Sequence, residues 1–226
     1  FRISQNWIGG SSLASAKFIP PNYRYIDELM GDVERFIHNE SNNVPHLIKI
    51  AILHYQFETI HPFLDGNGRV GRLLITLYLV GQGILNKPAL YLSDYLERNR
   101  DEYYSHLTAI REKNQIIPWI KFFLKGIIST ATNAKETFIK IIQLQKDMEV
   151  KLHSFGTKSE KINTILNSFY DTPILSVKDI VIITGIADKT TRNMLELMLE
   201  EGLIKEMTGY GRNKLFIFEK YFNLFK

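Results

Sequence analysis

Residues 61–72 bring together, in one short stretch, the side chains and backbone freedom that a phosphate-handling site needs. The unperturbed pKa of a histidine lies near neutrality, so His61 could accept a proton there. Asp65 could offer hard oxygen ligands to a Mg²⁺ that substrate phosphates also bind. Gly66 and Gly68 permit positive φ, so that successive backbone N–H groups could turn toward an anion.

A helix is expected to begin directly after this glycine-rich loop, with its positive end facing the same anion. Arg69 and Arg72 are three residues apart, which places them on one face of the helix, where each guanidinium could grip a phosphate. Residues 69–80 are apolar on nearly every side, and this predicts a helix in the middle of a bundle. Such a mounting would hold the loop rigid.

The helix before the loop is predicted to open at Pro45 and to carry one apolar stripe. His54 lies on that stripe, and we interpret it as a hydrogen-bonded core histidine rather than a catalyst. The helix must end before Pro62, because a residue that precedes proline avoids the α region. His61 is therefore predicted to stand at a helix exit. A further amphipathic helix is expected over residues 27–38.

The same stretch resembles the signature of the Fic family, HPFxxGNGRxxR. All eight fixed positions match, namely His61, Pro62, Phe63, Gly66, Asn67, Gly68, Arg69 and Arg72. In that family this loop and helix transfer AMP from ATP to a hydroxyl group of a target protein. A glycine-rich helix entry with a stray histidine is the alternative, and it would leave Asn67 and both arginines unexplained.

The resemblance implies a role for each motif residue, with ATP and Mg²⁺ as the bound groups. His61 would be the general base, Asp65 the metal ligand, Arg69 the contact of the β-phosphate and Arg72 that of the γ-phosphate. The loop amides and Asn67 would stabilise the anionic transition state. The full nucleotide-binding set is Gly66, Asn67, Gly68, Arg69, Val70, Gly71, Arg72 and Tyr104.

Tyr104 enters this set because the family places the adenosine near a tyrosine pair at this point. It lies in a helix expected from residue 93 to 110. Packing between helices explains the tyrosines in or near this helix, Tyr91, Tyr95, Tyr103 and Tyr104, equally well. Where the family often has an asparagine seven residues later, this chain has Arg111, so that base contact is not carried over.

Residues 7–21 also resemble the Fic family, through Trp7-Ile8-Gly9-Gly10 and Phe18-Ile19-Pro20-Pro21. In the family this segment forms a β-hairpin flap over the active site. The free edge of such a flap could pair with an extended target peptide. The residues that fall on it by position are Ser15, Ala16, Lys17 and Phe18. An ordinary surface loop is the alternative.

The C-terminal part of the chain reads differently. Helices are expected over residues 161–170, 177–184 and 189–200, followed by strands over 203–207 and 214–218 around Gly209-Tyr210-Gly211. This order looks like a winged helix, a module that many Fic proteins carry. The expected fold is therefore an all-α, mainly helical Fic bundle over residues 1–150, which includes the small β-hairpin flap at about 7–21. A winged helix is expected over residues 151–226.

DNA contact by the winged helix is disfavoured by its charge. Lys189, Thr190, Thr191 and Arg192 open the helix that would read bases, and Arg212 and Lys214 lie on the hairpin. Residues 158–226 hold ten Lys or Arg but nine Asp or Glu, a balance of +1 that gives little counterion-release energy. Dimerisation, giving a homodimer, or target docking is favoured over nucleic-acid binding.

Composition excludes several classes of protein. The chain has 226 residues, of which 45% are hydrophobic, a net charge of +4 and no cysteine, so neither a disulfide framework nor a thiolate zinc site is expected. No apolar run is long enough to span a membrane, and a cytoplasmic location is the default expectation. The chain begins with Phe1 rather than Met, so further residues are expected upstream.

One expected feature is absent from the sequence. The Fic family commonly pairs the second signature arginine, here Arg72, with a glutamate in a motif like [ST]xxxE[GN]. Glu201-Gly202 has the right ending, but Leu197 stands where Ser or Thr should be. We therefore expect an inhibitory helix to lie before Phe1.

Two other functions remain open. The first is a DNA-binding regulator with a nucleotide-sensing Fic-like half, and an intact His61 speaks against it because sensing needs no base. The second is a Fic enzyme that removes AMP or moves another phosphate-containing group, which the motif does not exclude.

Overall fold

The structure is a computed structural model of residues 1–226, and it describes all of them except 40, 42, 88–89, 210–212 and 226. The chain divides into two compact units, Phe1–Ala134 (the first unit) and Lys135–Lys226 (the second unit). Helix α6 (Ile116–Leu152) begins in the first unit and ends in the second. The two units divide within this helix, whereas the boundary expected at residue 150 falls near its end and stays a prediction.

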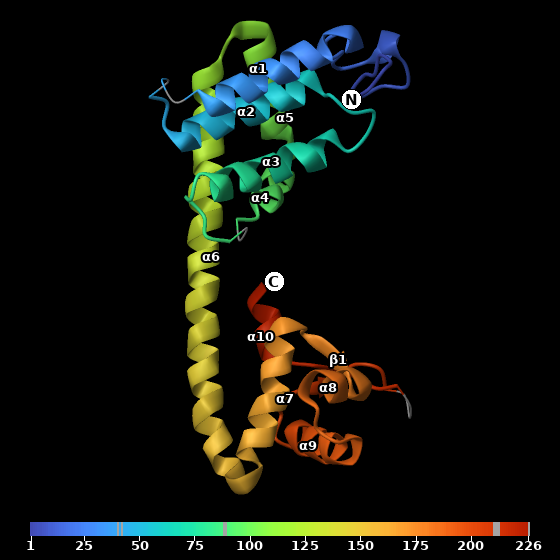
Figure 1. Cartoon of the computed structure of the whole chain (residues 1–226), viewed down its shortest axis with the longest axis vertical. Helices are drawn as coiled ribbons and strands as arrows, with labels where there is room; N and C mark the ends of the chain where they lie inside the picture. Colours follow the sequence, from blue (N-terminus) through green and yellow to red (C-terminus); the bar gives the residue numbers. More distant parts are fainter. Residues whose placement is uncertain (40, 42, 88–89, 210–212, 226) are drawn as a thin grey trace. The chain divides into compact units, whose positions relative to one another are not determined.

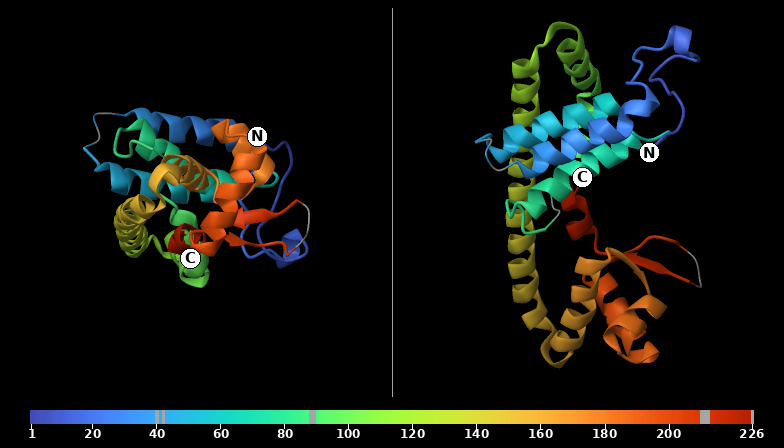
Figure 2. Two further views of the ribbon diagram at one scale, coloured as in Figure 1. Left: turned by 90° about the horizontal axis from the view of Figure 1, so that it is seen from below. Right: turned by 45° about the horizontal axis from the view of Figure 1, so that its top comes forward.

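The first unit is a bundle built around two apolar helices. Its helices are α1 (Ile26–His38), α2 (His46–Ile60), α3 (Asn67–Gly81), α4 (Leu92–Arg98), α5 (Arg100–Lys113) and the start of α6. Figures 1 and 2 show α1, α2 and α3 side by side. The core is fully buried at Ile50, Leu53, Ile75, Trp119 and Phe123. The mainly helical fold is confirmed. The placement of α3 in the middle of the bundle is wrong for one face of the helix, because Val70, Leu73 and Leu77 are exposed.

The helix expected over residues 93–110 is wrong in one respect, because it is two helices. Asn99 interrupts it with non-helical dihedral angles, φ −111° and ψ 36°. The Asn99 side chain donates to the carbonyl of Tyr95 over 2.8 Å, and this local bond competes with continuation of the helix. The break starts α5 afresh, and α5 carries Tyr103, Tyr104 and Arg111 toward the loop.

The N-terminal segment forms the expected hairpin only in minimal form. Ile8 and Phe18 make one antiparallel bridge, in which the Ile8 N–H donates to the Phe18 carbonyl over 2.9 Å. The turn between them contains the short 3₁₀ helix η1 (Leu13–Ser15), and a second one, η2 (Tyr23–Tyr25), leads into α1. Gly10 is required in this turn, since a Cβ there would lie 2.2 Å from the Ser15 carbonyl oxygen.

The second unit packs a helical layer against a small sheet. After η3 (His153–Lys158) come α7 (Ser159–Asp171), β1 (Ile174–Ser176), α8 (Val177–Thr184), α9 (Asp188–Glu200), β2 (Lys205–Glu206), β3 (Leu215–Ile217), α10 (Glu219–Phe222) and η4 (Asn223–Phe225). The sheet has the order β1-β3-β2 and is antiparallel. Its core includes Phe169, Ile180, Leu195 and Phe218, all essentially inaccessible to solvent.

The sheet corrects the two-stranded hairpin expected from the sequence. β1 is a third strand, in which Ile174 pairs with Ile217 across more than forty positions of sequence. A run of three residues gives no periodic signal, so only its partner strand makes it recognisable. β2 is also shorter than expected, because Leu203 is still tied to the end of α9 by a bond to the Met198 carbonyl. The tip residues 210–212, including Arg212, lie outside the described residues.

Among the helices of the described residues, none is long and apolar enough to cross a membrane.

Candidate active site

His61 lies at the exit of α2, as the sequence predicted. It is the C-terminal cap of that helix, and its N–H donates to the Phe57 carbonyl over 2.9 Å. Its backbone is left-handed, with φ 52° and ψ 60°, a conformation that non-glycine residues adopt rarely and at a cost. The surrounding contacts must therefore hold the residue in place.

Arg2 and Asn6 of the N-terminal segment provide much of that hold. The Arg2 N–H donates to the Pro62 carbonyl over 2.8 Å, and its Nε donates to the His61 carbonyl over 3.0 Å. The same guanidinium bonds the carbonyl of Pro21, and the residue is only 4% exposed. Asn6 Nδ2 donates to the Phe63 carbonyl over 3.0 Å. A buried charge thus fastens the backbone around His61 to the start of the chain.

Asn67 closes the loop from the other side. Its Nδ2 donates to the Phe63 carbonyl over 2.7 Å, and its Oδ1 accepts from the Phe63 N–H over 2.8 Å. The residue is 2% exposed. The structure therefore places the Asn67 side chain on the loop backbone, where it fixes the shape of the turn between His61 and α3.

The N-terminus of α3 presents free donors beside this loop. The first intrahelical bond joins the Val70 N–H to the Gly66 carbonyl over 3.0 Å, so the N–H groups of residues 67–69 precede the ladder and have no intrahelical partner. Gly66 has φ 79°, whereas Gly68 is already helical, so only the first of the two glycines uses positive φ. Free N–H groups at a helix start form an anion site.

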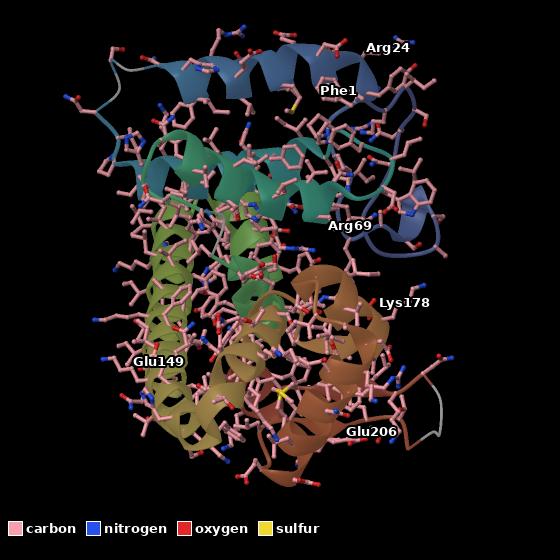
Figure 3. All side chains as sticks on the ribbon, turned by 60° about the horizontal axis from the view of Figure 1, so that its bottom comes forward. Phe1, Arg24, Arg69, Glu149, Lys178 and Glu206 are labelled. Carbon is pink, nitrogen blue, oxygen red and sulfur yellow. The ribbon has the colours of Figure 1, made fainter. Side chains whose placement is uncertain are left out.

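The two motif arginines turn back toward that helix start. A Cβ on Gly66 would lie 3.3 Å from Arg69 Nη2, and a Cβ on Gly68 would lie 3.2 Å from Arg72 Nη1. Helical side chains generally point toward the N-terminus, and here this brings both guanidinium groups to the loop. Figure 3 labels Arg69 at the first turn of α3. The glycines thus leave room for cations beside the free N–H groups.

Asp65 is the acidic residue of the loop and is open to solvent. Its side chain is 96% exposed, and Arg69 Nη2 lies 3.6 Å from its Oδ2. No group of three or more His, Cys, Asp or Glu that could hold a metal occurs among the residues the structure describes. One open carboxylate fits a Mg²⁺ that takes its other ligands from phosphates and water, and does not fit a metal held by protein alone.

Glu58 is a buried carboxylate that the sequence analysis did not select. It is 7% exposed, and its Oε1 has no hydrogen-bond partner. A Cβ on Gly71 would lie 2.4 Å from this oxygen, so Gly71 is the residue that admits it between α2 and α3. Burial raises the pKa of Glu58 to about 7, although the charges of Arg72 and Arg111 oppose the rise.

His54 supports the loop from beneath, as a core histidine. It is fully buried, and burial lowers its pKa to about 4, so the ring is neutral. Nδ1 lies 3.0 Å from the Gly71 carbonyl and Nε2 lies 3.0 Å from Tyr103 Oη. A carbonyl only accepts, so Nδ1 donates to Gly71 and Nε2 accepts from Tyr103. This chain ties α2, α3 and α5 together behind the site.

The electrostatic setting keeps His61 unprotonated. Burial lowers its pKa, and the nearby cations Arg2 and Arg111 lower it further, while the backbone of Glu58 acts in the opposite direction. Nδ1 is buried without a partner that meets hydrogen-bond geometry. Nε2 is therefore the nitrogen left to accept a proton. A neutral imidazole at pH 7 is the form that a general base requires.

The remaining predicted residues are spread around the loop. Tyr104 is 46% exposed, with its ring 5.1 Å from that of Tyr103. Val70 instead lines an apolar groove of about 380 Å³ with Phe1, Leu73 and Leu77. In the flap, Ser15 Oγ accepts from the Ser11 and Ser12 N–H groups, so it folds the tip. Lys17 is exposed, and Ala16 and Phe18 are half-buried.

Sequence reasoning missed three charged residues of the site, namely Arg2, Glu58 and Arg111. For Glu58 a signal existed, because it lies four residues after His54 on the apolar stripe of α2, where an acid is out of place. Arg2 and Arg111 carry no such signal, since their partners are remote in sequence.

Comparison with known proteins shows what the first unit is similar to. Residues 2–79 match the sequence model of the Fic/DOC family. Over 100 residues the chain is 39% identical to a probable protein adenylyltransferase of Aquifex aeolicus, covering 44% of this chain and 28% of that protein. Over 123 residues it is 32% identical to the protein adenylyltransferase Fic of Drosophila melanogaster, covering 54% of this chain and 22% of that protein.

A solved structure resembles the whole fold. A Fic family protein from Desulfovibrio desulfuricans G20 aligns with a TM-score of 0.53 at 23% identity, over 96% of this chain and 62% of that one. The chain spans about a quarter of the length of the curated relatives it matches. Over the matched segments it is homologous to protein adenylyltransferases.

Proposed function

We infer that this chain, a Fic/DOC family protein by its residues 2–79, transfers AMP from ATP to a hydroxyl group of a protein target. The observation that carries the inference is the meeting of three features at the start of α3. They are a neutral His61, a row of free backbone N–H groups, and two guanidinium groups turned toward them. Its curated relatives are named protein adenylyltransferases, which supports the same reaction.

In the proposed reaction, the target hydroxyl gives its proton to Nε2 of His61 and its oxygen attacks the α-phosphorus of ATP. The bond from the α-phosphorus to the bridging oxygen breaks, and pyrophosphate leaves with that electron pair. The free N–H groups at the start of α3 stabilise negative charge on the transferring phosphoryl group. Arg69 and Arg72 hold the β- and γ-phosphates and so keep the leaving group in line.

Asp65 is the residue that would hold Mg²⁺, which when bound supplies charge neutralisation on the phosphates. Other residues in and around the loop hold its backbone in place. Asn67, Arg2 and Asn6 fix its backbone at residues 61–63, so that His61 stays at one distance from the start of α3. Preorganisation of this kind lowers the barrier because no group has to move during transfer.

For the second unit we propose a winged helix that serves dimerisation or target docking. Helix, strand, helix pair and two further strands follow in that order, which supports the assignment. Several of its basic side chains pair with neighbouring acidic residues. Arg192 makes two bonds to Asp188, Lys214 lies 2.9 Å from Glu206, and Lys205 pairs with Glu219. Side chains paired in this way offer little to a DNA backbone, so no specific observation favours the DNA-binding regulator.

The test uses two forms of labelled ATP. The protein is incubated with Mg²⁺, a cell lysate and ATP labelled at either the α- or the γ-phosphate. We expect labelled protein with the α-label alone. Label from γ-ATP would mean phosphate transfer and contradict the proposal. Absence of label from either, combined with release of AMP from a pre-modified protein, would favour the reverse reaction.

A further inference from the structure

Arg111, near the end of α5, joins the flap to the helix that carries His61. Its Cζ lies 3.6 Å from the centre of the Phe18 ring, so the guanidinium rests on the face of the ring. Its Nε donates to Thr59 Oγ1 over 3.3 Å. Thr59 is two residues before His61 in α2, and Phe18 is the flap residue that bridges to Ile8. One side chain thus touches both parts.

This contact differs from the other cation–ring contacts of the structure. The pairs at Arg24, Lys49 and Arg100 have cation-to-centroid distances of 5.9, 5.4 and 5.8 Å. Arg111 is closer, and it is half-buried, with burial lowering its pKa. A desolvated cation–π contact is worth more than an exposed one. Of the four pairs, the Arg111 pair has by far the shortest distance, and it is the one that involves the flap, so it contributes to holding the flap.

Beyond the base of the flap, where Arg2 bonds the Pro21 carbonyl and Gln5 the Pro20 carbonyl, its described residues have few other contacts that hold it in place. Its own backbone contributes one bridge, through the N–H groups of Ile8, Lys17 and Phe18. Trp7, Gly9 and the tip around Leu13 are exposed. A hairpin with so little pairing is only marginally stable on its own. A tertiary contact at Phe18 should accordingly decide how much of the time the flap is formed.

We propose that Arg111 is a positioning residue that fastens the flap at a fixed place relative to His61. The proposal rests on the proposed function, since a flap edge is useful only if a target segment pairs with it. By joining Thr59 to Phe18, Arg111 sets the distance between the edge that would hold the target and the imidazole that would take its proton. It does not need to touch nucleotide or target to do so.

The first experiment is independent of activity and measures hydrogen exchange of the backbone amides of Ile8, Lys17 and Phe18. The variants are Arg111→Leu, Arg111→Lys, Phe18→Leu and, as a matched control, Lys113→Gln. Lys113 is an exposed cation at the end of the same helix. We expect the three amides to exchange about tenfold faster in Arg111→Leu and in Phe18→Leu, because a partly buried cation–π contact is lost.

Arg111→Lys should fall between these variants and the wild type, because lysine keeps the charge but lacks the flat fork that stacks on a ring. Lys113→Gln should match the wild type. Unchanged flap amides in both leucine variants would overturn the proposal. An equal rise across α1 and α2 would also overturn it, since Arg111 would then be an ordinary core residue.

The second experiment measures transfer from α-labelled ATP and, separately, the ATP dissociation constant. In Arg111→Leu we expect transfer to fall about tenfold, in step with the loss of the formed flap, while ATP binding stays within about twofold. A loss of ATP binding equal to the loss of transfer would contradict a role through the flap. A wild type that transfers nothing would refute the proposed function, while the exchange rates would still decide whether Arg111 fastens the flap.

Discussion

The two units treat their buried polar groups in opposite ways. In the first unit, three buried side-chain atoms of the described residues have no hydrogen-bond partner, namely Asn6 Oδ1, Glu58 Oε1 and His61 Nδ1. In the described part of the second unit no such atom occurs. There, buried Ser168 donates to the Ile165 carbonyl over 2.6 Å and Thr191 to that of Ile186 over 3.2 Å.

An unpartnered buried polar atom costs free energy, so proteins retain few of them. All three of the first unit belong to α2, the loop after it, or the N-terminal segment that holds that loop. His61 adds a strained backbone at the same place. The first unit therefore gives up stability at the place where chemistry is proposed. The described part of the second unit shows no such loss of stability from unpartnered buried polar atoms.

Replacing the proposed base should have the largest effect. His61→Ala should leave ATP binding nearly intact and slow transfer by about 10²–10⁴, the range for loss of a general base. The reason is that the imidazole acts on the hydroxyl and not on the nucleotide. Single-turnover transfer from α-labelled ATP, with ATP binding measured alongside, checks this. Turnover equal to that of the wild type would remove His61 from the mechanism.

Replacing Glu58 should raise stability, in contrast to most core substitutions. The folded-state pKa lies above the unfolded value, so the carboxyl costs nothing at low pH and destabilises the unit as pH rises from about 4.5 through 7. Glu58→Gln should therefore stabilise the first unit by roughly 3 kcal/mol at pH 8 and by little at pH 4, since the pKa of about 7 already includes the opposing charges of Arg72 and Arg111.

Denaturant melts at the two pH values, followed by tryptophan emission, measure this difference. Both tryptophans, Trp7 and Trp119, lie in the first unit, so the signal reports that unit. Ser168→Ala in the second unit is the comparison, followed by circular dichroism because that unit contains no tryptophan. It removes a satisfied group and should show no such dependence on pH. If the Glu58→Gln variant is less stable than the wild type at pH 8, the ionised Glu58 carboxylate stabilises the fold through its neighbours, and the prediction is contradicted.

Metal dependence should respond to Asp65. EDTA should abolish transfer, and Asp65→Ala should raise the Mg²⁺ concentration for half-maximal transfer by at least about tenfold, the lower end of what loss of a supporting carboxylate costs a metal site. The measurement is a Mg²⁺ titration of the transfer rate. Full activity in EDTA would contradict the assignment of the metal to this loop.

The smallest effect is expected in the second unit. Arg192→Gln breaks an exposed pair with Asp188 and should change the transfer rate by less than about twofold, as surface substitutions usually do. A DNA mobility-shift assay at two salt concentrations should show no salt-sensitive binding for this variant or the wild type. Salt-dependent DNA binding by the wild type that Arg192→Gln abolishes would show that the second unit is a functional DNA-binding module and would contradict this prediction.

Much of the fold followed from local pattern. The helix predicted over residues 27–38 agrees with α1 to within one residue. The helix predicted over residues 177–184 has the same first and last residue as α8, because Ser176 caps its start and Gly185 ends it. Helix starts and ends depend on a few adjacent residues, so the sequence carries them. The sequence did not predict the break at Asn99, because it depends on one side chain that bonds the Tyr95 carbonyl in competition with the helix. It did not predict strand β1, because that strand is recognisable only through its pairing with β3.

The sequence alone specifies which residues make up the loop and that His61 stands where α2 must end, and it predicts the start of α3 within two residues. These features follow from bonds and dihedral angles within a few positions. The packing of the folded chain was needed to show that Arg2 holds the loop from 59 positions away, that Glu58 Oε1 is buried without a hydrogen-bond partner, and that Arg111 reaches Thr59 across 52 positions. Contacts of that span depend on how the helices pack, and packing is settled by the whole core rather than by any one stretch.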